Sequence, residues 1–443
     1  MPTNHANAEN SGSWLEASGL RHILRTLGLA IHPAKLGIAL GTLFLTFVLG
    51  GTLDWLWTRQ GGIDAAAITQ YISARELDRA YVEPAGELGV FHVWREHQRR
   101  CVLGFLSASL PGTSLAAGTP LGAYVESNAH AGPLRNLAGM AYGVLWMFRV
   151  HPLFFLLFGG VGLVLWAWGG GAICRLAAVQ FARDEKPTMK QALAFAWDRL
   201  IGGFVLAPCI PLVFVLIGAI LLAMAGMILR VPILGDVFAG LAFGLALFGG
   251  FVIAVLLIGF LIGGSLFWPT VAVEGSDAFD SFSRSLSYPL SKPWKAMLYA
   301  VLSVVYASLC WVFVNLFVYA SLSITRALVG FGTSPFGWWN RGTAESPVRK
   351  LDLLWPLGGP NALYTWPDWS RLSWYESISA FWIGVYVLIV VGLVWAFLAS
   401  FYFSGSTVLY FLLRRDVDGT DLEEVLIDDE PDGEPIAATP AAP

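Results

Sequence analysis

Charged residues are scarce in this sequence. Only 13% of its 443 residues are charged, whereas 56% are hydrophobic. A soluble domain carries about 25% charged residues. A charge at the centre of a bilayer costs at least about 2.5–3.5 kcal/mol, so this deficit is expected where most side chains face lipid. The composition excludes an ordinary water-soluble domain, and no basic patch points to nucleic acid.

Residues that ligate metals are also few. None of the seven histidines lies inside an apolar run, and His92 and His97, five residues apart, do not share one helical face cleanly. The four cysteines show no zinc or disulfide spacing, and we expect them to act as small hydrophobes. They are Cys101, Cys174, Cys209 and Cys310.

Acidic residues are absent from the interior of the apolar runs; Asp54 and Asp236 stand at their ends. Proton- or sodium-coupled carriers usually hold carboxylates within the membrane, so such coupling is disfavoured. The stretch Asp416–Asp421 suggests a calcium loop, but an EF-hand needs glycine sixth and glutamate twelfth, where this chain has Asp421 and Ile427. We therefore predict no catalytic, cofactor-binding or metal-ligating residues, and no cofactor.

What the chain has instead is a set of apolar runs long enough to cross a bilayer. A helix rises about 1.5 Å per residue, so roughly 20 residues span a hydrocarbon core of about 30 Å. The runs are Leu36–Leu53, Pro152–Cys174, Ile201–Leu229, Val237–Val273, Met297–Ile324 and Ser379–Phe403. We predict an all-α, polytopic transmembrane bundle of about six spans.

Basic residues set the orientation of such a bundle, because short loops rich in Lys and Arg face the cytoplasm. The one short loop on the other side, Arg230–Asp236, has a single arginine. We predict a multi-pass protein of the inner (plasma) membrane with both termini cytoplasmic. The basic set comprises Arg21, Arg25, Lys35, Arg175, Arg183, Lys186, Lys190, Arg199, Arg284, Lys292, Lys295, Arg414 and Arg415.

The run Val237–Val273 is too long for one upright helix and contains the pairs Gly249–Gly250 and Gly263–Gly264. It forms either one tilted span followed by an interfacial piece from Ser265, or two short spans that would reverse everything downstream. The basic residues of Arg284–Lys295 favour one span.

The predicted chain divides into seven segments. They are a cytoplasmic N-terminal segment with an amphipathic helix (1–35), the first span (36–57), an extracytoplasmic helical segment (58–151), spans two to five with cytoplasmic helices (152–325), an extracytoplasmic Trp-rich loop (326–376), the sixth span (377–413) and an acidic cytoplasmic tail (414–443).

The N-terminal segment lacks the early apolar region of a cleavable signal peptide, so we expect it to be retained. Met1–Ser13 is polar, and we expect disorder there. Leu20, Ile23, Leu24 and Leu27 predict an amphipathic helix within Trp14–Ala30, lying either on the membrane surface or on the protein itself.

Each span that returns to the cytoplasm is followed by a turn and a helix N-cap. Thr188 with Gln191, and Thr420 with Glu423, fit the capping box, and Ser276 precedes a helical pattern. We predict three two-span hairpins, each ending in a short cytoplasmic "elbow" helix. The alternative is that every membrane exit simply needs a turn and a cap.

The outer segments also carry helical patterns. Phe91–Phe105 and Leu134–Phe148 have helical spacing, and Ile63–Asp78 is compatible with a helix. We expect the first outer segment to be a small helical cap. Within the spans, Ser308 and Asn315 are expected to hydrogen-bond between helices or to line a polar pathway, and Pro208 and Pro211 to kink the third span.

Two stretches carry a family resemblance: Gly171–Arg183, which reads GAICRLAAVQFAR, and Val273–Arg284, which reads VEGSDAFDSFSR. From the second span onward the chain resembles uncharacterised bacterial multi-pass membrane proteins. Their layout is similar to the membrane domain attached to some glycerophosphodiester phosphodiesterases, although no catalytic domain of that kind is present. The resemblance implies a helical membrane fold and supplies no site residues.

Three hypotheses follow. The first is a non-enzymatic scaffold, assembly partner or membrane-homeostasis factor, acting through its elbow helices and acidic tail, which would dock a protein partner or else stay solvated. The second is a channel or transporter for a neutral or lipidic substrate. The third is an enzyme whose outer acids and histidines converge near Trp338, Trp339 and Trp355, and we favour it least. The lipid bilayer is the one partner common to all.

Overall fold

The computed structural model describes residues 19–109, 132–228, 234–333, 341–343, 346–356 and 363–426. Predictions on Met1–Ser13, on the loop before Asp236 and on Trp338 and Trp339 lie outside these residues. The helices are α2 (Leu20–Ala30), α3 (Pro33–Trp57), α4 (Ala67–Glu76), α5 (Val90–Ala108), α7 (Pro133–Val150), α8 (Pro152–Arg183), α9 (Met189–Asp198), α10 (Leu206–Ile228), α11 (Leu234–Gly263), α12 (Phe267–Glu274), α13 (Ala278–Ser291), α14 (Pro293–Thr333), α15 (Lys350–Leu354) and α16 (Trp374–Asp418).

The structure confirms the all-α class and the six candidate spans. Six helical stretches of the described chain are long and apolar enough to cross a membrane: α3, α8, α14, α16, the stretch Leu200–Met227 that includes α10, and the stretch Phe243–Glu274 that includes most of α11 and α12. Without water to bond backbone groups, an apolar run of this length satisfies them internally as a helix. The strands of the described residues are short antiparallel pairs, β1 (Gly62–Ile63) with β2 (Ala85–Gly86) and β3 (Arg341–Thr343) with β4 (Ser346–Val348).

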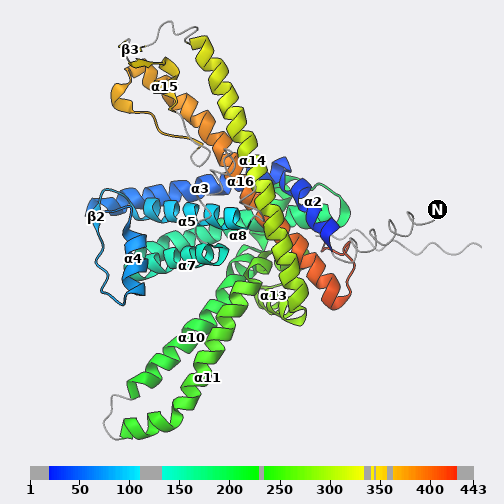
Figure 1. Cartoon of the computed structure of the whole chain (residues 1–443). Helices are drawn as coiled ribbons and strands as arrows, with labels where there is room; N and C mark the ends of the chain where they lie inside the picture. Colours follow the sequence, from blue (N-terminus) through cyan, green and yellow to red (C-terminus); the bar gives the residue numbers. More distant parts are fainter. Residues whose placement is uncertain are drawn as a thin grey trace, which may run out of the picture.

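The spans pair in sequence order into three hairpins, α3 with α8, α10 with α11, and α14 with α16. Figure 1 shows the hairpins pointing away from one another, from a centre where α2, α8, α13, α14 and α16 meet. We call this centre the hub. It contains α2, α9, α12, α13 and the adjoining ends of the spans, and its cores join side chains as distant as Ile38, Phe204 and Phe403.

Two of the three predicted elbow helices are confirmed. Thr188 forms the predicted capping box with Gln191 at the start of α9. The N-cap of α13 is Asp277, one residue after the expected Ser276. The third prediction was wrong within the described residues: α16 continues to Asp418, and residues 419–426 form no helix and contain a turn at 422–423.

A short helix therefore precedes each two-span hairpin, instead of ending it as predicted. These helices are α2, α9 and α13. Each second span or its extension ends in a left-handed residue whose N–H bonds a carbonyl four residues earlier. These residues are Asp184 (φ 54°), Gly275 (φ 67°) and Gly419 (φ 71°). A left-handed C-cap stops a helix and turns the chain, so the same device redirects the chain at all three hub exits.

The run Val237–Val273 contains one long helix. Helix α11 continues through Gly249–Gly250, and a 3₁₀ turn at Gly264–Leu266 separates it from the short α12. The run therefore forms one long helix, as in the first alternative, and not two short ones. The break has a packing cause: a Cβ added at Gly263 would lie 2.7 Å from the carbonyl oxygen of Ser285, so the backbone of α13 occupies that side of the helix.

Helix α2 packs on the protein itself. It buries Ile23 and Leu29 in the hub, and the Tyr306 hydroxyl donates a hydrogen bond to the carbonyl of Leu24 at 3.1 Å. Helices α4, α5 and α7 confirm the helical outer segment. Figure 1 shows α5 and α7 running along the α3–α8 hairpin, and Leu103 of α5 clusters with Trp311 of α14.

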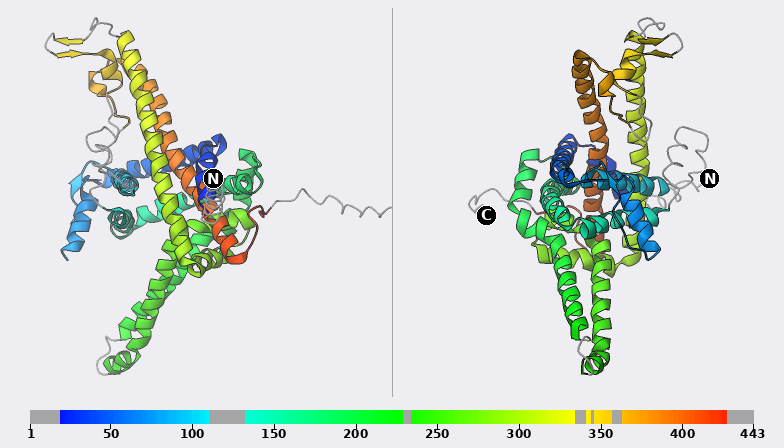
Figure 2. Two further views of the ribbon diagram at one scale, coloured as in Figure 1. Left: turned by 45° about the vertical axis from the view of Figure 1, so that its right-hand side comes forward. Right: turned by 90° about the vertical axis from the view of Figure 1, so that its left-hand side faces the viewer.

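The α10–α11 hairpin stands apart from the rest of the chain. In the apolar 18-residue stretch of each of its two spans, only 11% and 6% of the residues are buried within the protein. The corresponding shares for the other four spans are 28–33%. Both views in Figure 2 show this hairpin extending away on its own. Its two helices pack on each other through Gly218 and Gly249, which face Ile253 and Leu222. The outward faces of both helices are thus uncovered by the rest of the described chain.

Candidate functional site

The most concentrated polar site in the described chain surrounds Glu274, the last residue of α12. Its carboxylate lies 3.1 Å from Nε of Arg414 on α16 and 3.0 Å from Nη1 of Arg284 on α13. The Tyr410 hydroxyl donates a short hydrogen bond to the same carboxylate. The side chains of Glu274 and Arg414 are only 10% and 11% exposed. The contacts with Arg414 and Arg284 are ion pairs, and the contact with Tyr410 is a hydrogen bond, so one carboxylate joins three helices.

Two tyrosines extend this site toward the end of α16. The Tyr288 hydroxyl donates to Asp418 at 2.5 Å, and the Tyr299 hydroxyl donates to Asp416 at 2.9 Å. Lys295 lies 3.1 Å from Asp416. Burial, followed by the hydrogen bond to Asp418, raises the pKa of Tyr288 to about 12, so the phenol remains a neutral donor at physiological pH.

The beginning of the acidic tail is docked on the hub. We call residues 419–426 the strap. Arg414 donates to the carbonyl of Glu424 at 2.9 Å, the N–H of Leu426 donates to the carbonyl of Val273 at 2.9 Å, and Val425 is buried in the hub core. The strap occupies the positions at which the third elbow helix was predicted, and it contacts the hub instead of forming that helix. The rest of the tail lies outside the described residues.

Buried cations on the other side of the hub also join helices. Lys35 is 1% exposed, and its ammonium donates to the carbonyl of Leu29 at 3.0 Å and to Oε1 of Gln180 at 2.9 Å. Arg175 donates to the carbonyl of Ala272 at 3.1 Å, and its guanidinium lies 4.1 Å from the ring centre of Phe195. These ties link α2, α3, α8, α9 and α12.

The residues weighed for chemistry are not brought together. His97 points to α7, with Nε2 2.9 Å from the carbonyl of Gly139, while the side chain of His92 is exposed. His151 pairs with Glu83 at 2.9 Å, whereas Trp355 packs on Leu351 in a separate cluster. Within the described ranges, no group of three or more metal-ligating side chains occurs.

Ser308 was expected to bond between helices or to line a polar pathway, and its bond is instead local. The Ser308 hydroxyl donates to the carbonyl of Val304 in its own helix at 2.9 Å, and both Ser308 and Asn315 are buried. A π-helical segment, Leu200–Val205, directly precedes α10. Pro208 lies in the first turn of α10, and Pro211 lies inside the helix. The third span therefore enters the membrane through irregular helix.

Sequence reasoning placed Glu274 only in a turn and did not find its partners. The only local signal was its position at the end of an apolar run. A carboxylate that is buried there needs a positive charge or hydrogen-bond donors beside it. The identity of the partners required the contact between α12 and α16, which are far apart in sequence.

No protein family model, curated protein or solved structure is significantly similar to this chain, so the likeness to glycerophosphodiester phosphodiesterase membrane domains remains an expectation.

Proposed function

We propose that this protein is a non-enzymatic membrane scaffold, with an assembly or membrane-homeostasis role. The observation that carries the proposal is the contrast between the hub and the α10–α11 hairpin. In the hub, the buried charges of Glu274, Arg414 and Lys35 bond to other helices and hold three hairpins together. The hairpin, in contrast, is uncovered over nearly its whole length.

An uncovered hairpin suits association within the membrane. Transmembrane helices associate by close packing and hydrogen bonding, because lipid is as apolar as the helix surface. The outward faces of α10 and α11 carry large exposed apolar side chains, such as Phe214 (48% exposed), Leu245 (74%) and Phe248 (62%). We propose that a protein partner packs there, in the inner membrane, with the hub and both termini in the cytoplasm.

The test is site-specific photo-crosslinking in intact cells. A photoreactive residue at Leu245 or Phe248 should capture one reproducible protein, and the same residue at Phe204, buried in the hub, should capture none. Affinity purification in mild detergent with mass spectrometry should recover the same protein. Crosslinking to lipid alone, together with purified protein that passes solute in liposomes, would contradict the scaffold.

A channel or transporter for a neutral or lipidic substrate is the second candidate. The irregular start of the third span favours it, because π-helical and proline-containing segments often occur at functional sites. Liposomes containing the purified chain should then move substrate. Pro211→Ala should change that rate without unfolding the hub.

A further inference from the structure

Helix α9 presents two apolar faces. Ala192, Phe195 and Ala196 are buried against the hub. Met189, Leu193 and Trp197 follow at four-residue spacing on a second face, where Met189 is 45% and Trp197 63% exposed. A soluble elbow would need only the first face. The second face is what an interfacial helix presents to the acyl chains of a leaflet.

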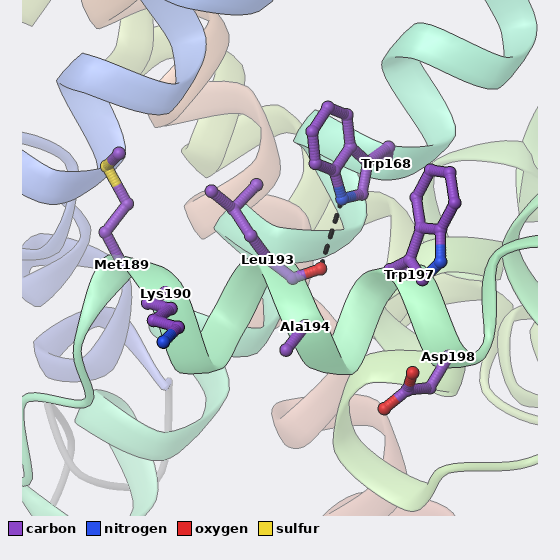
Figure 3. Close-up of a pocket in the computed structure, with 7 residues that line it drawn as sticks. All are labelled: Trp168, Met189, Lys190, Leu193, Ala194, Trp197 and Asp198. Carbon is purple, nitrogen blue, oxygen red and sulfur yellow. Dashed lines mark hydrogen bonds between the residues drawn. The ribbon is translucent and has the colours of Figure 1, made fainter.

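This second face and Trp168 of α8 line a shallow, open groove of about 430 Å³. In Figure 3, Met189, Leu193 and Trp197 point to the same side of α9 as Trp168. The Trp168 indole N–H donates to the carbonyl of Leu193 at 3.1 Å, and the Trp168 and Trp197 rings meet edge to face at 5.8 Å. The groove walls are therefore held by bonds within the protein.

The depth of the groove fits the membrane interface. Trp168 stands 16 residues into α8, counted from Pro152, which corresponds to about 24 Å of helix and approaches the far side of a hydrocarbon core of about 30 Å. Tryptophan is enriched at this level. An acyl chain can lie in the groove while its headgroup meets the end of α9.

Positive charge gathers at one end of the groove. Lys190 lines it, and Lys186 is exposed just before α9. Of the nearby acids, Asp184 pairs with Arg25 at 2.8 Å, and Glu185 is exposed. Asp198 lies at the opposite end, about 12 Å along the helix.

We propose that the groove between Trp168 and α9 holds one acyl chain of an anionic phospholipid, whose phosphate lies at Lys186 and Lys190. The positive end of the α9 helix dipole adds to the attraction for the phosphate. This site is separate from the α10–α11 faces, so the inference does not depend on the scaffold proposal.

The test is native mass spectrometry of the full chain, titrated with dioleoylphosphatidylglycerol or dioleoylphosphatidylcholine. A lysine near a headgroup phosphate contributes enough for about a fivefold change in affinity. We expect Lys190→Ala to weaken phosphatidylglycerol binding about fivefold and to leave phosphatidylcholine binding unchanged. Trp197→Ala should weaken binding of both lipids.

The matched controls are Lys292→Ala and Trp294→Ala, which alter exposed residues at the start of α14, at another hub exit. Both should bind lipid as the unaltered chain does. Equal binding of the two lipids by the unaltered chain, or equal losses in the controls, would overturn the proposal. The Trp197→Cys variant in liposomes gives a further test. A disulfide between the Cys residues of two chains would also overturn the proposal, because a second copy of the chain would then occupy the groove.

Discussion

The N–H of Leu426 donates a hydrogen bond to the carbonyl of Val273 at 2.9 Å, so the strap is joined to the last turn of α12. The bond holds Val425 in the hub core beside Tyr288 and Leu412. The C-terminal segment is therefore part of the fold up to this point, although its composition is that of a solvated acidic tail.

The strap should contribute to stability. Val425→Asp places a charge among apolar side chains, and we expect a loss of at least about 2 kcal/mol of unfolding free energy. Thermal unfolding in detergent measures the change. Glu423→Ala, at an exposed position of the same segment, should leave the midpoint unchanged. Equal midpoints for the two variants would show that the strap is not docked in solution.

Glu274 should be the most sensitive charge in the hub. Glu274→Gln removes the buried counter-charge of Arg414 and leaves it only the exposed carboxylate of Glu424, 3.3 Å away. Breaking such a buried pair should cost about 3 kcal/mol of unfolding free energy. Asp280→Asn is the matched control. The side chains of Asp280 and Arg284 are 44% and 40% exposed, so their ion pair should contribute under about 1 kcal/mol to the free energy of unfolding. Adding Arg414→Gln to Glu274→Gln should recover part of the loss, and a strictly additive double variant would argue against direct coupling.

Asp54 should hold the outer helices onto the first span. Its carboxylate accepts hydrogen bonds from the backbone N–H groups of Phe91 (2.7 Å) and His92 (2.9 Å) at the start of α5. Loss of an N-terminal cap costs about 0.5–2 kcal/mol, so Asp54→Ala should speed hydrogen exchange in the first turn of α5. Gly89→Ala should act similarly, because its Cβ would lie 2.2 Å from the Asp54 carboxyl carbon. Unchanged exchange in both variants would exclude the cap.

The packing of α5 on α7 should weaken in acid. Burial, opposed by the hydrogen bond to Gly139 and assisted by Arg100, lowers the pKa of His97 below its ordinary 6.5. A histidine whose pKa is lowered on folding stabilises the fold fully above 6.5, and this contribution is lost as pH falls through the folded value. Limited proteolysis of this helix pair should therefore accelerate between pH 7.5 and pH 5.

His97→Gln should flatten that pH dependence, because glutamine does not titrate. His92→Gln, on the exposed side of the same helix, should leave it intact. A pH profile that is the same in both variants would remove His97 as its cause.

Much of this architecture could be predicted from local sequence. The six spans follow from the length of the uncharged runs, and α9 follows from the Thr188–Gln191 capping box. Such features depend on neighbours within a few residues. The third elbow failed for the opposite reason: Thr420 and Glu423 carry the same local signal, but Arg414 and Val273 hold the chain in another conformation.

By itself, the sequence determined that this chain resides in lipid and that its backbone forms long helices, because transfer free energy and internal hydrogen bonding act residue by residue. Tertiary structure alone decided which charges meet, where the strap docks and which hairpin stays uncovered. Glu274, Arg284 and Arg414 become one site only when three helices converge, and a buried charge is stable there because its partners arrive from distant parts of the chain.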